Sequence, residues 1–174
     1  MARARGARWA AALAALGLAG CANPVVGTGT AERTGRVVRV IDGDTVKVAL
    51  HGRTETVRLL GIDTPESGRP QTPVECGSKQ AGSTLRRMVL DREVVLQSDP
   101  TQDDVDRFGR TLAYVTVDGR DAGEAMVASG WAKAYVYRGV PFERAGAYRA
   151  AERDAARRGA GVHGACGGEF HRAA

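Results

Sequence analysis

The sequence predicts one mainly β domain of the α+β class, with five strands and three helices. Two observations support this fold class. Short apolar or alternating runs of strand length, separated by turn dipeptides that contain glycine, open the domain. Longer runs further along the chain place apolar residues on one face of a helix. A chain of 174 residues is long enough for one such domain and an appendage.

Three consecutive antiparallel strands are expected at 37–41, 46–50 and 54–60. Each run alternates or is continuously apolar over a length typical of strands. The dipeptides Asp42-Gly43 and His51-Gly52 between them are typical of the tight turns that join such strands.

The first helix and two more strands follow a loop at 67–76 that contains proline and glycine. Apolar residues on one face predict a helix over 78–90. Apolar runs at 93–96 and 111–117 predict the fourth and fifth strands, with an acidic loop at 99–110 between them.

Two more helices are expected in the last third of the chain. The expected elements are a helix from 121 to 130, an extended aromatic segment at 131–137, a charged helix over 141–158 and a C-terminal tail at 160–174. Asp121 and Glu124 have the spacing of a capping box at the start of the first of these helices. The tail is rich in glycine and is expected to be loose apart from Cys166.

Residues 1–20 predict an export signal of the lipoprotein type. Three arginines precede an apolar stretch over 9–19, which is too short to span a bilayer as a permanent helix. Residues 18–21 resemble a bacterial lipobox, in which Cys21 becomes the lipid-modified first residue, and cleavage nearby without a lipid is the alternative. A flexible tether is expected over 21–34. The protein is therefore expected to be exported, and either secreted or anchored to the membrane through Cys21 alone.

The cysteine count favours a disulfide. If Cys21 carries a lipid, Cys76 and Cys166 remain as an even pair in an oxidising compartment. They can then bridge the first helix to the C-terminal tail. Two buried free thiols are the alternative.

The net charge of +5 overstates the basicity of the mature protein. Three of the 25 basic residues, and none of the 20 acidic ones, lie in residues 1–20, so the remainder carries only +2. Affinity for nucleic acid must therefore come from local placement of charge rather than from bulk charge.

Polar residues gather around the ends of the first three strands. Asp44 opens the second strand, Arg58 lies inside the third, and Asp63, Thr64 and Glu66 follow where the third ends. Adjacent strands lie about 4.8 Å apart, so carboxylates distant in sequence can meet at one end of a sheet. Oxygen ligands that converge in this way make a site for a hard divalent cation.

The chain resembles the staphylococcal nuclease (thermonuclease) family through four motifs in family order. They are Ile-Asp-Gly-Asp-Thr at 41–45, Arg-Leu-Leu-Gly-Ile-Asp-Thr-Pro-Glu at 58–66, Asp-Arg-Phe-Gly-Arg at 106–110 and Ala-Tyr-Val-Tyr at 134–137. The resemblance covers about 35–159. It implies a five-stranded OB-type β-barrel with three helices, and a calcium-dependent phosphodiesterase site that acts on DNA and RNA.

The resemblance implies that one calcium ion (Ca2+) is held by the Asp44 and Asp63 carboxylates and the Thr64 backbone carbonyl. Asp42 is expected to orient a metal-bound water, although Asp-Gly-Asp taken alone is also typical of a plain hairpin turn. Glu66 follows a proline that stiffens its backbone, and it is the candidate general base for the attacking water. A solvated loop acid is the alternative for Glu66.

Arg58 and Arg110 are expected to clamp the phosphate, because a guanidinium donates two parallel hydrogen bonds to phosphate oxygens. The alternative for Arg58 is a surface ion pair. Arg107 is expected to contact a terminal phosphate. It stands where the staphylococcal enzyme has lysine, and Phe108 stands where that enzyme has tyrosine. Phosphate binding is therefore expected to differ in detail.

Tyr135 and Tyr137 alternate along an extended segment and are expected to point to the same side as walls of a nucleotide pocket. Ordinary packing is the alternative. His51, His163 and His171 show no metal-ligand or base-nucleophile spacing and are expected to be turn or tail residues, which disfavours zinc and cysteine-based catalysis.

These residues predict a monomeric nuclease that hydrolyses DNA and RNA with little sequence preference and, by the resemblance, leaves 3′-phosphate products. A non-catalytic OB module that binds nucleic acid or protein is the alternative. A phosphodiesterase for small molecules is a third possibility.

Overall fold

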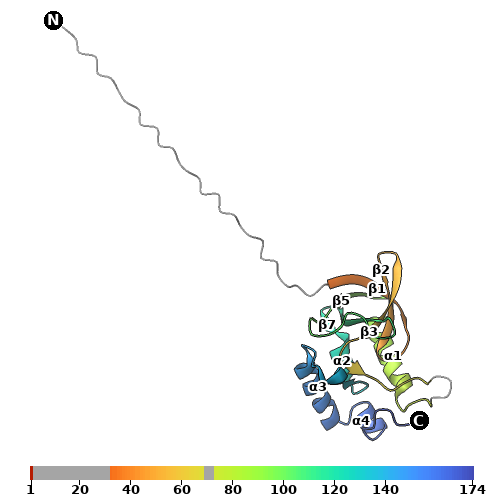
Figure 1. The fold of residues 1–174 in the computed structure, drawn as a ribbon. Helices are drawn as coiled ribbons and strands as arrows, with labels where there is room; N and C mark the ends of the chain where they lie inside the picture. Colours follow the sequence, from red (N-terminus) through yellow and green to blue (C-terminus); the bar gives the residue numbers. More distant parts are fainter. Residues whose placement is uncertain (2–31, 69–72) are drawn as a thin grey trace.

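The computed structural model describes residues 32–68 and 73–174 together with Met1 (Figure 1). The predicted export signal, Cys21 and most of the predicted tether lie outside the described residues. In the part of the chain that is described, no helix has the length and apolar character needed to cross a membrane.

Five strands form a closed mixed β-barrel, as predicted. They are β1 Glu32–Val40, β2 Thr45–Leu50, β3 Arg53–Leu59, β5 Glu93–Gln97 and β6 Thr111–Val117. The order β3-β2-β1-β5-β6 is antiparallel throughout, and a parallel pairing of β3 with β6 closes the ring. Strand β1 begins within the segment expected to be a tether, where Glu32 pairs with Gln97.

Two very short pairings accompany the barrel. Strand β7 (Arg120–Asp121) extends the edge of β6, and β4 (Ile62–Asp63) pairs with β8 (Lys133–Ala134) outside the ring. Asp63 lies opposite Lys133 in the second pairing. Strands of two residues carry no usable sequence period, so β4 and β8 were not predicted as strands.

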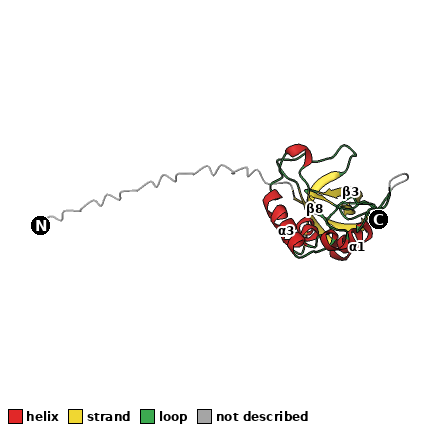
Figure 2. Ribbon diagram, turned by 90° about the horizontal axis from the view of Figure 1, so that it is seen from below, coloured by secondary structure: helices red, strands yellow, loops and turns green. Residues whose placement is uncertain are grey.

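Three helices lie together beside one end of the barrel (Figure 1, Figure 2). They are α1 Ser78–Val89, α2 Ala122–Ala128 and α3 Ala145–Arg157, followed by a short α4 at Val162–Ala165 and a 3-10 turn, η1, at Tyr137–Gly139. The Asp121 carboxylate accepts hydrogen bonds from the backbone N–H groups of Gly123 and Glu124 at the start of α2, as the capping motif predicts. Helix α3 begins later than predicted, because a turn from Phe142 to Ala145 precedes it.

The core fills the barrel and continues beneath the helices. Its largest fully buried side chains include Leu59 and Leu96 from the strands, Leu85 from α1 and Met126 from α2. Tyr148 of α3 is buried, and its ring packs edge-on against Phe142. This apolar layer fixes the helices against the barrel, so the loops between them are held in register with the strand ends.

The C-terminal tail is not loose, and that expectation was wrong. Cys76, just before α1, forms a disulfide with Cys166, which confirms the predicted pair. Beyond it, Glu75 and Ala173 form an antiparallel bridge, and the Cys76 N–H donates to the Arg172 carbonyl at 2.8 Å. The Val74 carbonyl accepts from the N–H of Ala174 at 2.9 Å. The tail pairs with the segment before α1 because the disulfide brings the two backbones together.

Candidate active site

The hairpin between β1 and β2 holds Asp44 in a buried position, with 4% of its surface exposed. The Asp44 N–H donates to Asp42 Oδ1 at 3.1 Å, which closes the turn. Gly43 packs so tightly that an added Cβ would lie 2.7 Å from Thr64 Oγ1. The Thr64 hydroxyl therefore reaches Asp44 Oδ2 at 3.1 Å, and the Thr45 hydroxyl donates to Asp44 Oδ1 at 2.9 Å.

Arg58 lies between the two aspartates that the sequence singles out. The β2–β3 register places it opposite Thr45, next to Asp44. Its Nη2 lies 3.0 Å from Asp44 Oδ2 and 3.9 Å from Asp63 Oδ1. Asp44 and Asp63, from distant parts of the chain, thus face the same guanidinium nitrogen. The structure brings these three residues together, and the Arg58 side chain is only 14% exposed.

The clustering of acids affects Asp42. Burial, together with the negative charge of Asp44, raises the pKa of Asp42 to about 6. The hydrogen bond that Asp42 accepts from the Asp44 N–H opposes this rise. Two carboxylates so close together are favoured by a nearby cation, which Arg58 supplies on the Asp44 side.

The other oxygen of Asp63 makes contacts that the sequence did not predict. Asp63 Oδ2 lies 3.3 Å from Lys133 Nζ and 3.0 Å from His171 Nε2. The second ring nitrogen of His171 lies 2.9 Å from Glu75 Oε2. Glu75 Oε2 also accepts the Glu66 N–H at 2.7 Å. His171 was expected to be an ordinary tail residue, and no motif or spacing in the sequence indicated this contact.

Glu66 is half-buried at the edge of the same cluster. Two hydrogen bonds join its backbone to Glu75. The Glu66 N–H donates to the Glu75 carboxylate, and the Glu66 carbonyl accepts from the Glu75 N–H at 3.0 Å. The stiff Thr64-Pro65 step and this pairing fix the position of the Glu66 main chain.

Arg110 approaches the cluster from the loop before β6. Its Nε donates to Asp106 Oδ2 at 2.7 Å, while its Nη1 lies 3.4 Å from Thr45 Oγ1. The Thr45 hydroxyl therefore contacts both Arg110 and Asp44 and links the two side chains. In the same loop the guanidinium groups of Arg107 and Arg110 lie 4.7 and 5.4 Å from the centre of the Phe108 ring, which is 65% exposed.

Tyr135 and Tyr137 lie close together at the surface, although the expected extended segment at 131–137 does not continue through Tyr137, which begins the 3-10 turn η1. Their ring centroids lie 6.5 Å apart, and Tyr135 and Tyr137 are 42% and 44% exposed. The Tyr135 N–H donates to the Gly61 carbonyl at 2.8 Å, which ties this segment to the chain just before Asp63. The pair is thus a surface feature rather than part of the core.

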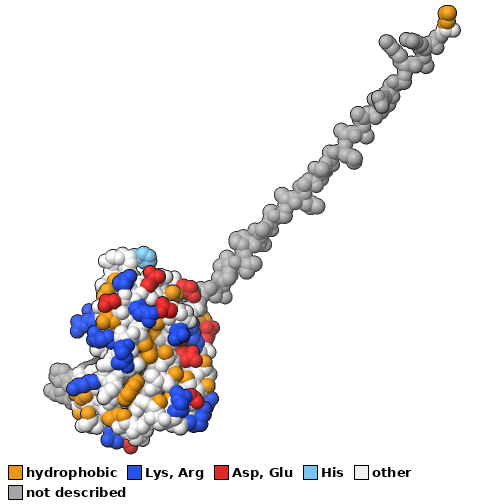
Figure 3. Space-filling view, turned by 180° about the vertical axis from the view of Figure 1, so that it is seen from behind, with side chains coloured by type: hydrophobic (Ala, Val, Ile, Leu, Met, Phe, Trp, Pro, Cys, Tyr) orange, Lys and Arg blue, Asp and Glu red, His pale blue; other side chains and the backbone are white. Residues whose placement is uncertain are grey.

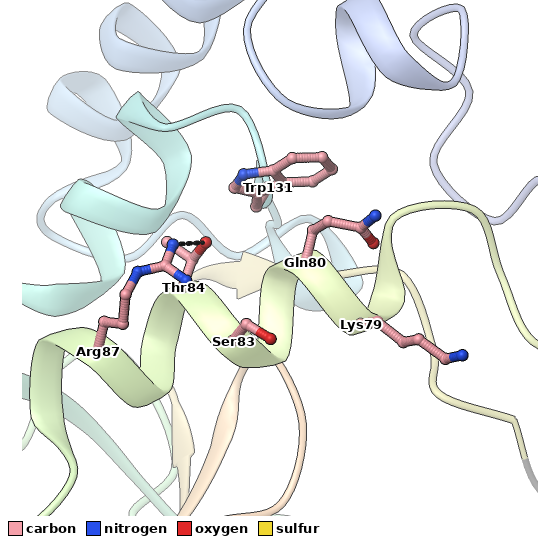
Figure 4. A pocket seen from close by; sticks show the side chains of 6 residues that line it. All are labelled: Lys79, Gln80, Ser83, Thr84, Arg87 and Trp131. Carbon is pink, nitrogen blue, oxygen red and sulfur yellow. Dashed lines mark hydrogen bonds between the residues drawn. The ribbon is translucent and has the colours of Figure 1, made fainter.

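A separate shallow pocket of about 350 Å3 lies along α1 (Figure 4). It is lined by Lys79, Gln80, Ser83, Thr84, Arg87 and Trp131. None of these is a predicted site residue, and the lining has no acidic side chain.

On the face opposite Figure 1, basic and acidic side chains are interspersed (Figure 3). The surface in this view therefore shows no single basic stripe.

The donor set at Asp44 and Asp63 fits a hard cation better than a borderline one. Among the residues that the structure describes, no group of three or more histidine, cysteine, aspartate or glutamate side chains is arranged to hold a metal ion. The Asp44 and Asp63 carboxylates both approach Arg58 Nη2, and the Thr64 hydroxyl donates to Asp44. Carboxylate oxygens of this kind suit an ion that takes its remaining ligands from water and substrate oxygens.

The fold and the site define an OB-type barrel protein with a cluster of acids and arginines at the strand ends. The chain belongs to the staphylococcal nuclease family, since the family model described as "Staphylococcal nuclease homologue" matches residues 56–163, more than half of its length.

Named relatives agree with this membership. The chain is 40% identical over 107 residues to the thermonuclease of Staphylococcus hyicus, covering 62% of each protein. It is 41% identical over 100 residues to endonuclease YncB of Bacillus subtilis, covering 57% of this chain and 47% of that protein. It is 39% identical over 101 residues to the thermonuclease of Staphylococcus intermedius, covering 58% of this chain and 59% of that protein. The match thus spans less than two thirds of each relative.

Proposed function

We propose that this protein is a calcium-dependent nuclease that hydrolyses phosphodiester bonds of DNA and RNA with little sequence specificity and leaves 3′-phosphate products. The observation that carries the proposal is the approach of Asp44 and Asp63 to one nitrogen of Arg58. Family membership supports a nuclease, because the named relatives are thermonucleases and an endonuclease.

Asp44, Asp63 and the backbone carbonyl of Thr64 would hold one calcium ion, and Asp42 would orient a water on it. When bound, the ion neutralises and orients the scissile phosphate. The protein's own contribution is to keep Asp44 buried and hydrogen-bonded by the Thr45 and Thr64 hydroxyls, so that the carboxylate needs little rearrangement.

Arg58 and Arg110 would grip the phosphate oxygens as charge develops on phosphorus. Arg58 would turn from Asp44 to a phosphate, because a guanidinium can donate to either oxyanion. Arg110 is already oriented by its ion pair with Asp106. In the absence of substrate these acids keep both guanidinium groups in place.

Glu66 would accept a proton from the attacking water. The water oxygen forms a bond to phosphorus, the bond from phosphorus to the 5′-oxygen breaks, and the departing oxygen takes a proton from solvent. The fixed backbone of Glu66 limits the positions that its carboxylate can reach. This supports a catalytic role over that of a solvated loop acid.

Tyr135 and Tyr137 would stack on bases, since their accessible rings offer an aromatic platform of little sequence preference. Arg107, stacked on Phe108, would contact a terminal phosphate.

The Cys76–Cys166 disulfide supports an exported protein, secreted or held by a lipid at Cys21. Mass spectrometry of the mature N-terminus tests the lipid.

The test is calcium-dependent degradation of denatured DNA by the wild-type chain and by Glu66→Gln. Loss of a general base costs about 100-fold to 10,000-fold in rate, so the variant should be at least about 100-fold slower. Glu93→Gln, at an exposed position on β5, is the matched control and should keep full activity. Equal rates for wild type and Glu66→Gln would exclude this role for Glu66.

The same assay tests the other classes of function. Binding of denatured DNA by the wild type without cleavage would select the non-catalytic OB module. Faster turnover of a dinucleotide ester than of a long strand would select a small-molecule phosphodiesterase.

A further inference from the structure

The C-terminal tail is attached at two successive points to the segment just before α1. The Cys76–Cys166 disulfide joins it to the start of α1. The antiparallel bridge between Glu75 and Ala173 then sets its register. His171 lies between these two attachments, so the direction of its side chain is determined by both.

The backbone of His171 supports a specific placement. Its φ of 73° lies in the left-handed region, which is unfavourable for most residues other than glycine, and more accessible to asparagine, aspartate and histidine. Such a conformation persists where the surrounding contacts hold it. Here both ring nitrogens are engaged, Nδ1 at 2.9 Å from Glu75 Oε2 and Nε2 at 2.9 Å from Lys133 Nζ and 3.0 Å from Asp63 Oδ2.

The two oxygens of Asp63 have different surroundings. Oδ2 faces Lys133 and His171, while Oδ1 faces Arg58 and, through it, Asp44. The tail therefore contacts Oδ2, the outer oxygen of Asp63, and not the oxygen that faces Arg58. Contacts on that outer oxygen limit rotation of the carboxylate and leave Oδ1 directed at the proposed ion position.

His171 also reaches the proposed general base through Glu75. The Glu75 oxygen that faces His171 Nδ1 is the one that accepts the Glu66 N–H. One tail side chain thus contacts the acid that supports Glu66 and also contacts Asp63. Partners of this kind, which hold metal-binding carboxylates from outside, commonly change metal affinity about 10-fold to 100-fold when they are lost.

We propose that the disulfide-clamped tail is part of the metal site, with His171 as a positioning residue that orients Asp63, so that calcium affinity depends on the Cys76–Cys166 bond. This inference rests on the proposed function. Reduction of the disulfide by an external dithiol yields two cysteine thiols and the oxidised reductant, and it releases the tail from the start of α1. His171 then leaves Asp63, and the site loses affinity without loss of the barrel.

The experiment measures calcium binding to the full chain by titration calorimetry. His171→Asn keeps a residue that tolerates the left-handed backbone but shortens the side chain, so it cannot reach both carboxylates. His51→Asn is the matched control, because His51 also has a positive φ, 45°, but lies in the exposed turn between β2 and β3. We expect about 10-fold weaker calcium binding for His171→Asn and no change for His51→Asn.

The disulfide is tested in the same assay with Cys76→Ser/Cys166→Ser, alone and combined with His171→Asn. The double cysteine variant should lose about as much affinity as His171→Asn, and the triple variant should lose no more, because both changes remove the same contact. Wild type treated with dithiothreitol should match the double variant. Thermal unfolding in EDTA checks that each protein is folded, and the His171→Asn result decides the proposal if the cysteine variant is not.

A positioning role also predicts how cleavage responds. His171→Asn should need about 10-fold more calcium for half-maximal activity, while its rate at saturating calcium recovers towards wild type. Unchanged calcium affinity in His171→Asn would overturn the proposal, and tighter binding would show that the tail blocks the site. If the wild type neither binds calcium nor cleaves DNA, the proposed function fails and this inference fails with it. Calcium-dependent wild-type cleavage with unaffected variants removes this inference alone.

Discussion

Replacement of Arg58 by methionine should destabilise the calcium-free protein strongly. Methionine keeps much of the side-chain volume but removes the cation between Asp44 and Asp63. Asp44 stays buried, 4% exposed, with its negative charge close to Asp42 and without its ion-pair partner. A buried carboxylate in that situation loses much of its stabilisation, because water cannot replace the missing guanidinium.

The size of the effect can be worked from the contacts. Loss of one partner from a buried ion pair costs about 3–5 kcal/mol. The Thr45 and Thr64 hydroxyls still donate to Asp44 in the variant, so we expect about 3 kcal/mol, at the lower end of that range. With a urea m-value of about 2 kcal/mol/M, the unfolding midpoint should fall by about 1.5 M.

The assay is urea unfolding in EDTA, followed by far-ultraviolet circular dichroism. Arg33→Met is the matched control, since Arg33 forms an ion pair with Glu55 at 2.8 Å but is 40% exposed. Exposed pairs of that kind contribute at most about 1 kcal/mol, so the control midpoint should fall by no more than about 0.5 M. An Arg58→Met midpoint equal to that of wild type would refute the view that Arg58 balances the buried acids.

Three further predictions concern the core, the loop before Asp63 and the tyrosine platform. Burial opposes ionisation of Asp99, but hydrogen bonds from Thr101, Tyr114 and a backbone N–H outweigh it and lower the pKa of Asp99. This stabilisation is present above the ordinary aspartate pKa and is lost as pH falls through the lowered value, so in an acid titration followed by circular dichroism Tyr114→Phe should unfold at higher pH than wild type. Gly61→Ala should lower stability to urea by about 1–3 kcal/mol, because the new Cβ would lie 2.6 Å from the Phe142 ring at a φ of 78°, and unchanged stability would contradict that packing. Tyr135→Leu should weaken binding of denatured DNA in EDTA by about 1–3 kcal/mol per stacked base, and equal affinity would exclude stacking.

The strands and the core of the site were predictable because they depend on local patterns. Alternation with period two, broken by Asp42-Gly43 and His51-Gly52, marked the first hairpins, and the β2–β3 register then brought Arg58 beside Asp44. Asp63 lies only four residues beyond Leu59, where β3 ends, which explains why it approaches the same arginine. These placements follow from short-range pairing, which a sequence encodes directly.

The outer half of the site could not be predicted, because it depends on pairings too short to leave a pattern. Lys133 reaches Asp63 through the two-residue pairing of β4 with β8. His171 reaches it through an isolated bridge at Glu75 and one disulfide. The even cysteine count indicated the covalent link, but a link at Cys166 does not determine where a residue five positions later will lie.

The contacts of Asp63 on its two oxygens should affect cation binding differently, since Arg58 faces Oδ1 while Lys133 and His171 face Oδ2. Arg58 contacts Asp44 Oδ2 and Asp63 Oδ1 on the inner side, so on the proposed function it would compete with the metal and would move towards a phosphate when substrate and ion arrive together. Lys133 and His171 stand on the outer side, where they can remain while an ion binds Oδ1. Because a bound phosphate gives Arg58 a new partner, calcium and substrate should each strengthen binding of the other. Calcium titrations with and without a nucleotide diphosphate should therefore show tighter calcium binding when the nucleotide is present, and this difference should shrink in Arg58→Met.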